Sequence, residues 1–407
     1  MSSFGDQEEA VALPVIGLAA LTHGAYAGVD LQPIWEGLLA RVREDAYDAG
    51  ALMDMAIVLQ LTGQKAQGLE AQRHAVALHQ TYVRPGQPGG LRLLAFVTPG
   101  DFMANTPLDF LLEGTATSLT EIYMVEGEPL PPVPDHDLAF VAIGESDDSC
   151  EVLENLAPML EVWPRPVLNR NVKSISGLSR DAVSQLFAGS EQVIAPRTVR
   201  VGRGDVERVA AGEADVAMLR QEGMPWPWII RPVGSHAGGD LERLSDPQAL
   251  SAYLAKVEAT EFFVAPFIEY AGSDGLYRKY RIALIGGKAF ISHLAISEHW
   301  MVHYLNSGMS TDGAKRDEEA RAMENFDQDF AGRHAKGLAE LCEKIELDYF
   351  GIDCAETADG RLLLFEADVA MIIHSMDEPE LYPYKAPAMQ KLFAGFNAML
   401  MSTAGRT

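Results

Sequence analysis

GIDCAETADGRLLLFEADVAM, residues 351–371, contains two apolar runs separated by Asp359-Gly360. An Asp-Gly pair between apolar runs favours a β-hairpin with a two-residue type I′ turn. Counting outward from that turn places Asp353 opposite Glu366 at a closely spaced pair of positions. The stretch therefore predicts an antiparallel strand pair in which two carboxylates face each other.

Asp368 follows Glu366 by two residues, so the hairpin carries three acidic side chains on one face. Like charges that face each other destabilise a sheet, and carboxylates are rarely buried without a partner. One interpretation is a Mg²⁺ site, because hard cations bind carboxylate oxygens and Mg²⁺ also binds substrate phosphates. The other is a polar sheet face whose acids pair with Arg or Lys. The spacing of Asp353, Glu366 and Asp368 leaves both interpretations open.

The composition is that of a globular protein, with 407 residues of which 48% are hydrophobic and 22% charged. The length suggests about two to three domains. A net charge of −26 opposes binding to nucleic acid or to an anionic membrane surface, although it is compatible with a local basic pocket. No apolar run approaches the ~20 residues of a membrane-spanning helix, and acids precede the first short apolar run. Three cysteines without metal-type spacing favour a reducing compartment, so we expect a cytoplasmic protein.

Residues 1–85 are expected to form a small helical domain. Residues 48–82 show apolar positions at helical spacing on both sides of Thr62-Gly63, which predicts a helical hairpin. This hairpin resembles one tetratricopeptide unit, and a single unit cannot bury its apolar face alone. The helical domain is therefore expected to pack on the rest of the chain as a structural extension, or to bind a protein or peptide partner.

Residues 91–170 are expected to form a small βαβ-type domain after the linker at residues 84–90. Strands are predicted at residues 91–98, 118–125, 137–144 and 165–169, and helices at residues 106–114 and 148–163. The first strand is not followed by a GxGxxG turn, so a dinucleotide site is not indicated.

The remaining residues, 171–407, alternate between helical and strand patterns, which makes the fold class α+β. The main elements expected are a helix at 174–189, a strand at 192–201, a helical stretch at 204–220, strands at 227–234 and 261–270, and a helix at 245–257. A hairpin around Gly286-Gly287, a long helix within 315–345 and a last helix near 386–401 follow.

The acidic hairpin resembles the metal signature of the ATP-grasp superfamily, and most closely the RimK-like and glutathione-synthetase-like carboxylate–amine ligases. Asp353, Glu366 and Asp368 match the family's metal ligands, with Asp368 standing where the family has Asn. The resemblance implies ATP held between two α+β subdomains, at about residues 171–262 and 263–407, after a pre-ATP-grasp domain and the helical domain. It also implies one or two Mg²⁺ ions, with Mn²⁺ as an alternative metal.

PWIIRPVGSHAGGDL, residues 227–241, resembles the family's phosphate-binding strand and glycine-rich loop. Arg231 stands where the family has Lys, so a planar guanidinium that can bind phosphate through two hydrogen bonds replaces a compact ammonium group. His236 in the loop is expected to be a bystander. Backbone N–H groups of the loop are expected to approach phosphate oxygens at Gly234, Ser235, Gly238 and Gly239.

EFFVAPFIEY, residues 261–270, resembles the hinge strand that holds adenine through the carbonyl of Pro266 and the N–H of Ile268. An acid that binds ribose is expected a few residues later, and the sequence leaves Glu269 and Asp274 as alternatives.

RKYRIALIGGKAF, residues 278–290, resembles the family's Asp-x-Arg strand. Arg281 stands where the family has an Arg beside the transferred phosphoryl group, whereas Lys279 replaces the family's Asp. The alternative is that these basic residues form a solvated strand edge. The next stretch resembles a loop that offers polar groups to phosphate and acceptor, and here it contributes His299, His303 and Asn306.

The resemblance implies an ATP-dependent ligase that activates a carboxylate as an acylphosphate and joins it to an amine. Arg231 and Arg281 would carry the catalytic charge stabilisation. The substrates would be small molecules or peptides, and a homo-oligomer is left open. Two other functions also stay open: a nucleotide-binding scaffold that recruits a partner through the helical domain, and a small-molecule phosphotransferase.

Overall fold

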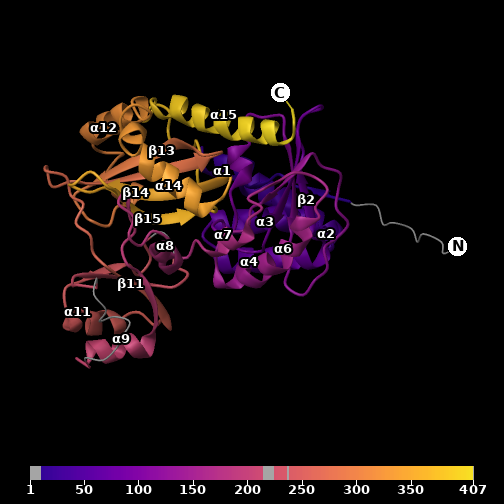
Figure 1. The fold of residues 1–407 in the computed structure, drawn as a ribbon. Coiled ribbons are helices and arrows are strands. Elements are labelled where there is room, and N and C mark those ends of the chain that lie inside the picture. Colours follow the sequence, from indigo (N-terminus) through magenta and orange to yellow (C-terminus); the bar gives the residue numbers. More distant parts are fainter. Residues whose placement is uncertain (1–10, 214–223, 236–237, 407) are drawn as a thin grey trace.

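The computed structural model of the chain describes residues 11–213, 224–235 and 238–406. In this part of the chain, three β-sheets of six, four and five strands are covered by helices (Figure 1). The α+β fold class predicted from the sequence is confirmed. No described helix combines the length and the apolar character needed to cross a membrane.

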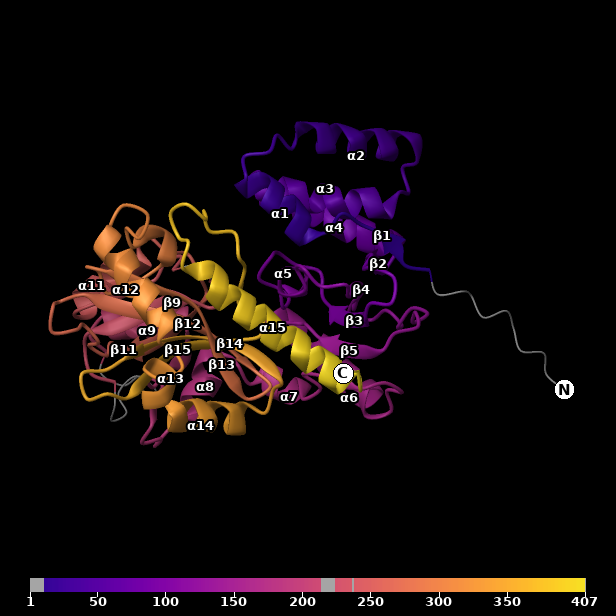
Figure 2. The ribbon, with the colours of Figure 1, turned by 90° about the horizontal axis from the view of Figure 1, so that it is seen from above.

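The N-terminal helices form a layer on one side of the molecule (Figure 2). They are α1 (Leu18–Tyr26), α2 (Gln32–Glu44), α3 (Ala49–Leu61) and α4 (Lys65–Leu78). The predicted helical hairpin is confirmed as α3 and α4. Asp48 caps α3 by accepting a hydrogen bond from the N–H of Ala51, and Gly63 makes the turn with a φ of +80°. The likeness to a tetratricopeptide unit stays a prediction.

Two strands within the first 85 residues were not expected. β1 (Leu13–Pro14) and β2 (Thr81–Arg84) flank the helical layer and join the six-stranded sheet, where β2 pairs antiparallel with β4. Both strands are too short to show the alternating pattern that identifies a strand in a sequence. One sheet therefore continues across the boundary predicted at residues 85–91.

The six-stranded sheet has the order β1-β2-β4-β3-β5-β6. Its other strands are β3 (Arg92–Val97), β4 (Ser118–Tyr123), β5 (Leu138–Val141) and β6 (Val167–Leu168), all at predicted positions. The accompanying helices are α5 (Leu108–Leu111), η1 (Asp147–Ser149) and α6 (Cys150–Glu161). β3 pairs in parallel with β4 and β5, which agrees with its nearly continuous run of buried residues.

The four-stranded sheet is antiparallel, with the order β10-β9-β11-β8. Its elements are β8 (Val199–Gly202), α9 (Arg203–Ala210), β9 (Trp228–Pro232), β10 (Glu242–Leu244), α11 (Pro247–Leu254) and β11 (Glu261–Pro266). The subdomain boundary predicted at residues 262–263 falls inside β11. Part of the helix predicted at residues 204–220 lies outside the described residues.

The strand predicted at residues 192–201 is two strands in two different sheets. β7 (Val193–Ile194) pairs with β15 in the five-stranded sheet, and β8 lies in the four-stranded sheet. Pro196 lies between the two strands, where it removes a backbone N–H and interrupts a ladder of hydrogen bonds. The prediction of one continuous strand was therefore wrong.

The five-stranded sheet has the order β13-β12-β14-β15-β7. Its strands include β12 (Tyr277–Ile285), β13 (Lys288–Ser297), β14 (Tyr349–Glu356) and β15 (Leu362–Asp368). The hairpin around Gly286-Gly287 is confirmed. The long helix predicted within residues 315–345 is broken. The remaining helices of the chain are α7 (Val172–Ser176), α8 (Arg180–Leu186), η2 (Tyr304–Asn306), α12 (Gly313–Glu324), α13 (Phe330–Arg333), α14 (Ala335–Ile345) and α15 (Lys385–Thr403).

The β14–β15 hairpin places Asp353 opposite Glu366 as predicted, but its turn differs. The N–H of Thr357 donates to the carbonyl of Arg361 over 3.0 Å, which leaves three residues in the loop. A register shift then leaves Phe365 without a facing residue, as a β-bulge. The extra loop residue and the bulge offset each other, so the wrong turn type led to the right pairing.

Helix α15 connects the five-stranded and six-stranded sheets. Its buried residues, including Leu392 and Phe396, share one hydrophobic core with Phe140 of β5 and Tyr349 of β14. The helix runs along this junction in Figure 2. The four-stranded sheet instead packs its own core around residues such as Ile230 and Phe262. The molecule is thus a fused pair of sheets with a third, separately packed sheet beside them.

Candidate functional site

A cleft of about 510 Å³ opens between the four-stranded and five-stranded sheets. β9 and β11 line it from the first sheet, and β12, β14 and β15 line it from the second. Part of the lining is apolar, and this part includes Ala195, Ile229, Ala265, Pro266, Phe267 and Leu363. The hinge residues Pro266 and Ile268 both line the cleft.

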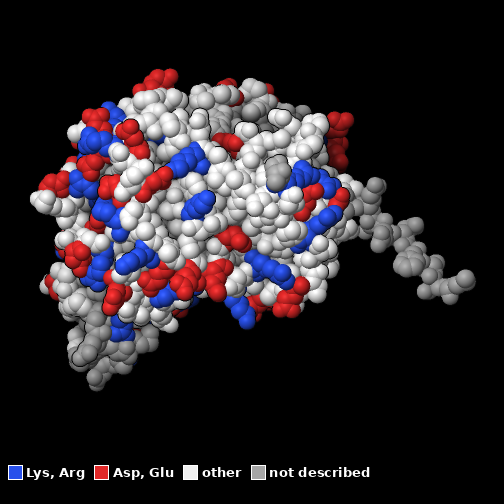
Figure 3. All heavy atoms as spheres, turned by 45° about the horizontal axis from the view of Figure 1, so that its top comes forward, with Lys and Arg blue, Asp and Glu red and all other residues white. Residues whose placement is uncertain are grey.

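The charged lining of the cleft is mainly basic. It comprises four cationic side chains, Arg180, Arg231, Lys279 and Arg281, against the carboxylates of Asp353 and Glu366. The chain as a whole carries a net charge of −26, and on the face in Figure 3 acidic and basic residues lie mixed rather than in one basic patch. A positive cleft in an acidic protein attracts a small polyanion to that place.

Asp353 is buried and held by two cations. Lys279 Nζ lies 2.8 Å from Asp353 Oδ2, and Arg281 donates Nε to Oδ1 at 2.9 Å and Nη2 to Oδ2 at 3.1 Å. The sheet sets this geometry, because Arg281 faces Asp353 across β12 and β14 and Lys279 lies two residues earlier. Burial would raise the pKa of Asp353, but Arg281 and then Lys279 hold that pKa far below its usual range. Asp353 therefore carries a stable negative charge that is already paired.

Glu366 is paired with Arg180, a residue that the sequence analysis missed. Arg180 donates Nη2 to Glu366 Oε1 at 2.7 Å and Nη1 to the carbonyl of Phe365 at 3.1 Å. Burial opposes ionisation of Glu366, but Arg180 lowers its pKa. Arg180 begins helix α8, where a cation meets the positive end of the helix dipole. That unfavourable placement is the signal that could have identified Arg180.

Arg231 lies on β9 and reaches the loop that follows it. Its Nε donates to Ser235 Oγ at 3.0 Å, and its Nη2 donates to the carbonyl of the same residue. Burial, followed by the charge of Arg180, lowers the pKa of Arg231 to about 10. Arg231 thus stays protonated near neutral pH and carries its charge into the cleft.

The glycine-rich loop is divided between two hollows. Gly234 and Ser235 line a smaller cavity of about 250 Å³ that adjoins the cleft. Gly238 lines the cleft, whereas Gly239 lines neither hollow. His236 lies outside the described residues.

Asp368 and Glu145 line the smaller cavity together. Burial, and then the charge of Glu366, raises the pKa of Asp368 to about 7. Burial, and then the charge of Asp368, raises the pKa of Glu145 to about 7. Glu145 follows β5 and was not singled out from the sequence, because only the fold brings that strand's end beside β15.

The acidic hairpin fits a metal only in part. In the described part of the chain, no three His, Cys, Asp or Glu side chains form a group suited to a metal ion. Asp353 is taken by Lys279 and Arg281, as in the second interpretation of its pattern. Glu366 and Asp368 each have only one oxygen in a hydrogen bond to described residues, to Arg180 and to the N–H of Ala370. Two such carboxylates suit one Mg²⁺, which completes its shell with phosphate oxygens and water.

The two candidate ribose ligands lie outside the lining described for the cleft. Glu269 accepts hydrogen bonds from the N–H groups of Tyr270 and Ala271, each at 3.0 Å. Asp274 pairs with Arg278 at 2.7 Å, and hydrogen bonds from Arg278 lower the pKa of Asp274. The geometry thus favours neither acid as a ribose ligand.

The loop after β13 brings His303 and Asn306 to the cleft, but not His299. The N–H of His303 donates to Asn306 Oδ1 at 3.1 Å. Burial and the charges of Lys279 and Arg281 lower the pKa of His303. His303 is therefore a neutral imidazole at neutral pH, able to accept a proton.

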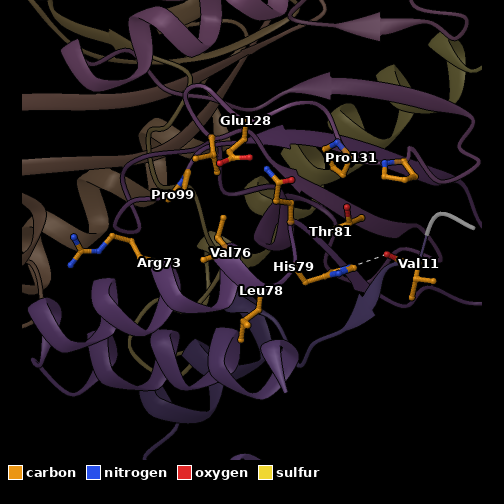
Figure 4. Close-up of a pocket in the computed structure, with 13 residues that line it drawn as sticks. Val11, Arg73, Val76, Leu78, His79, Thr81, Pro99, Glu128 and Pro131 are labelled. Carbon is orange, nitrogen blue, oxygen red and sulfur yellow. Dashed lines mark hydrogen bonds between the residues drawn. The ribbon is translucent and has the colours of Figure 1, made fainter. Parts of the chain in front are cut away.

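A second, larger cavity of about 870 Å³ lies between α4 and the proline-containing loop near Pro131 (Figure 4). His79 contacts the carbonyl of Val11 there at 2.9 Å. Among the described residues that line it, Arg73 and Glu128 are the charged ones, and these residues form no converging group of cations. The charged groups that can perform chemistry converge instead in the cleft between the four-stranded and five-stranded sheets.

The chain matches no protein-family model. It also matches no curated protein. Among solved structures, it is similar to the VanG D-Ala:D-Ser ligase from Enterococcus faecalis, at 12% identity and a TM-score of 0.46 over 76% of this chain and 99% of that one. It is similar to D-alanine–D-alanine ligase from Bacillus anthracis, at 14% identity and a TM-score of 0.44 over 77% of this chain and 97% of that one. It is also similar to a RimK domain ATP-grasp protein from Sphaerobacter thermophilus, at 13% identity and a TM-score of 0.38 over 76% of this chain and 99% of that one.

Proposed function

We propose that this protein is an ATP-dependent carboxylate–amine ligase of the ATP-grasp type. The observation that carries the proposal is the convergence of four basic side chains with an apolar hinge strand in one cleft between two sheets. The apolar lining suits a purine, and the cations suit a triphosphate. Both the acid and the amine are small molecules or peptides in this proposal.

The nucleotide is held in two parts. The carbonyl of Pro266 accepts from the adenine amino group and the N–H of Ile268 donates to the ring, as the hinge resemblance implies. Arg180 and Arg231 bind the phosphates, because both line the cleft and the adjoining cavity. Glu366 and Asp368 would hold a Mg²⁺ ion, which would supply charge neutralisation for the triphosphate.

The first chemical step is attack of a substrate carboxylate oxygen on the γ-phosphorus. The bond from that phosphorus to the bridging oxygen breaks, so that ADP leaves and an acylphosphate forms. Lys279 and Arg281 stabilise the charge on the transferred phosphoryl group and on the acyl oxygen.

In the second step, the amine attacks the acyl carbon and inorganic phosphate leaves with the electrons of the carbon–oxygen bond. The amine loses one proton in this step. His303 is the base that we assign to accept it, since it lines the cleft and its lowered pKa leaves the imidazole unprotonated before the step. Exclusion of water by the closed cleft would protect the acylphosphate from hydrolysis.

The first test is thermal unfolding of the purified chain with ATP and MgCl₂. We expect the melting temperature to rise, because a ligand that binds only the native state stabilises it. The variant Glu366→Ala should lose most of the rise. Asp359→Ala at the exposed hairpin tip is the matched control and should keep it. If the wild-type chain shows no shift, nucleotide binding is refuted.

Phosphate release then separates the three possible functions. A ligase releases phosphate only when an acid and an amine are added together, from panels of amino acids and short peptides. A phosphotransferase leaves a stable phosphorylated product, and a scaffold binds ATP without turnover. Either of the last two outcomes would overturn the ligase proposal while leaving the nucleotide site intact.

A further inference from the structure

Lys279 lies beside Asp353, at a place where the resemblance to ATP-grasp enzymes implies a metal ion. It lies on β12, lines the nucleotide cleft, and points to the same carboxylate as Arg281. We infer that the Lys279 ammonium is a built-in cation that takes the place of one metal ion, and that Asp353 positions Lys279 and Arg281 rather than ligating metal. This inference rests on the proposed function, since it concerns the same nucleotide.

Asp353 has little capacity left for a metal. Its two oxygens accept three hydrogen bonds from Lys279 and Arg281, at 2.8, 2.9 and 3.1 Å. A carboxylate offers about four acceptor positions in all. A divalent ion on the remaining position would stand beside two partly buried positive charges, and repulsion between like charges is strong where water is scarce.

The cations cannot easily turn away from Asp353. The pairing of β12 with β14 fixes Arg281 directly opposite Asp353, and a hydrogen bond of 3.0 Å from Arg281 Nη1 to the carbonyl of Ile372 fixes its outer nitrogen. The Lys279 side chain is only 15% exposed. The ammonium of Lys279 has three donors, and Asp353 uses one of them. The other donors remain for phosphate oxygens in the cleft.

The charge of the cleft leads to the same inference. Before any ion enters, the cleft lining has four cationic and two anionic side chains. Of the three candidate metal ligands, Asp353 has both oxygens in hydrogen bonds, whereas Glu366 and Asp368, which line the adjoining cavity, each keep one oxygen free of hydrogen bonds to described residues. We therefore expect one divalent ion per bound nucleotide, held on the side of Glu366 and Asp368.

The test counts Mn²⁺ ions by electron paramagnetic resonance, with the full chain saturated by a non-hydrolysable ATP analogue. Nucleotide occupancy is measured separately by displacement of a fluorescent ATP derivative. We expect one Mn²⁺ per bound nucleotide in the wild-type chain. In Lys279→Met, which removes the charge and keeps the length, we expect two Mn²⁺ per nucleotide and at least a tenfold weaker nucleotide affinity.

Arg278→Met is the matched control, because Arg278 is the neighbouring cation on β12 but pairs with Asp274 and Glu318 and does not line the cleft. It should keep one Mn²⁺ per nucleotide. Asp353→Asn should change Mn²⁺ affinity less than twofold, whereas Glu366→Gln should weaken it at least tenfold. A circular dichroism melt of each variant shows whether it is folded.

Any ratio other than one Mn²⁺ per nucleotide in the wild-type chain would overturn the inference. A ratio of one in Lys279→Met, or of two in Arg278→Met, would overturn it as well. If Asp353→Asn does not fold, the counts for Lys279→Met and the wild-type chain still decide. If the wild-type chain binds no nucleotide, the proposed function itself is refuted.

Discussion

Asp353 is the residue whose environment differs most from what its sequence pattern suggests. As a strand residue between Ile352 and Cys354, it could have been exposed or metal-bound, but its side chain is buried against Lys279 and Arg281. The sequence showed a basic group on one strand and an acidic group on another. It did not show that those two strands are neighbours, because the distance in sequence between residues 281 and 353 hides the pairing.

Removal of the Asp353 carboxylate should be costly. Asp353→Ala leaves Lys279 and Arg281 as unpaired, partly buried cations, and breaking a buried ion pair in this way costs about 3–5 kcal/mol. Urea unfolding should therefore show a large loss of stability. Asp359→Ala, which breaks an exposed pair with Arg361, should change stability far less, because exposed ion pairs contribute little. Equal losses in the two variants would contradict the buried pairing.

Asp368 predicts a pH dependence of the opposite sign to that of an ordinary paired acid. Its pKa in the folded chain is about 7, above the value of about 3.9 for an unfolded Asp. The folded state then binds more protons than the unfolded state between these values, so stability falls as the pH rises from about 4 to 7. Asp368→Asn removes this dependence. Its melting temperature should match that of the parent near pH 4 and exceed it increasingly up to about pH 7.

The contribution of Asp353 to the pH dependence of stability has the sign that is usual for a paired acid. Its pKa is depressed in the folded state, so its stabilising effect is complete above the unfolded value of about 3.9 and is lost as the pH falls below it. Asp368→Asn should leave this loss of stability at low pH unchanged. If the melting temperatures of parent and variant run parallel from pH 4 to 8, the raised pKa of Asp368 is wrong.

At the scale of elements, the β14–β15 hairpin shows what could be predicted and why. The apolar runs and Asp359-Gly360 correctly predicted two strands and the pairing of Asp353 with Glu366. The three-residue loop and the bulge at Phe365 could not be predicted, since the same Asp-Gly pair suits either loop length. The bulge depends on packing against strands far away in the sequence.

The turn itself can be tested at Gly360, whose φ is +80°. A side chain at this left-handed conformation costs roughly 1–2 kcal/mol, while Asn tolerates it better than Ala. Gly360→Ala should therefore lower the unfolding free energy by about 1 kcal/mol, and Gly360→Asn by less. A Cβ at this position meets no atom within 4 Å, so steric overlap would not explain a loss. Equal stability of Gly360→Ala and the parent in urea unfolding would contradict the assigned turn.

Other elements show the same limit. Pro196 separates β7 from β8, and nothing in the local pattern of residues 192–201 indicates that the chain passes from one sheet to another there. The placement of Arg180 at the start of a helix marks it as unusual, but its partner could not be identified, because that partner lies on β15, which begins at Leu362. By contrast, the hairpin at Gly286-Gly287 and helix α15 were predictable, since their signals are local.

At the scale of the whole molecule, an ion-pair cluster connects the four-stranded sheet to the six-stranded part. Arg200 of β8 donates to both oxygens of Asp147 at 2.7 Å and also pairs with Glu261 of β11. The side chains are partly exposed, with Asp147 at 57%, so the cluster should add less than about 1 kcal/mol to global stability. We expect its main effect to be on the relative position of the two parts.

Arg200→Ala should therefore change the melting temperature little but increase hydrogen exchange in β8–β11. Mass spectrometry of peptic fragments measures this directly. Arg208→Ala is a suitable control, because Arg208 pairs only with Asp205 and Glu213, close to it in the sequence, among described residues. Similar exchange in both variants would show that the Arg200 cluster does not hold the sheet.

Helix α15 gives the molecule a calorimetric signature. Because its buried side chains share one core with the five-stranded and six-stranded sheets, these parts should lose their structure in a single cooperative transition. The four-stranded sheet has a separate core and should melt in a transition of its own. The nucleotide of the proposed function would contact both melting units, so it should stabilise both and couple them. Heating the chain with ATP should merge two heat-capacity peaks into one.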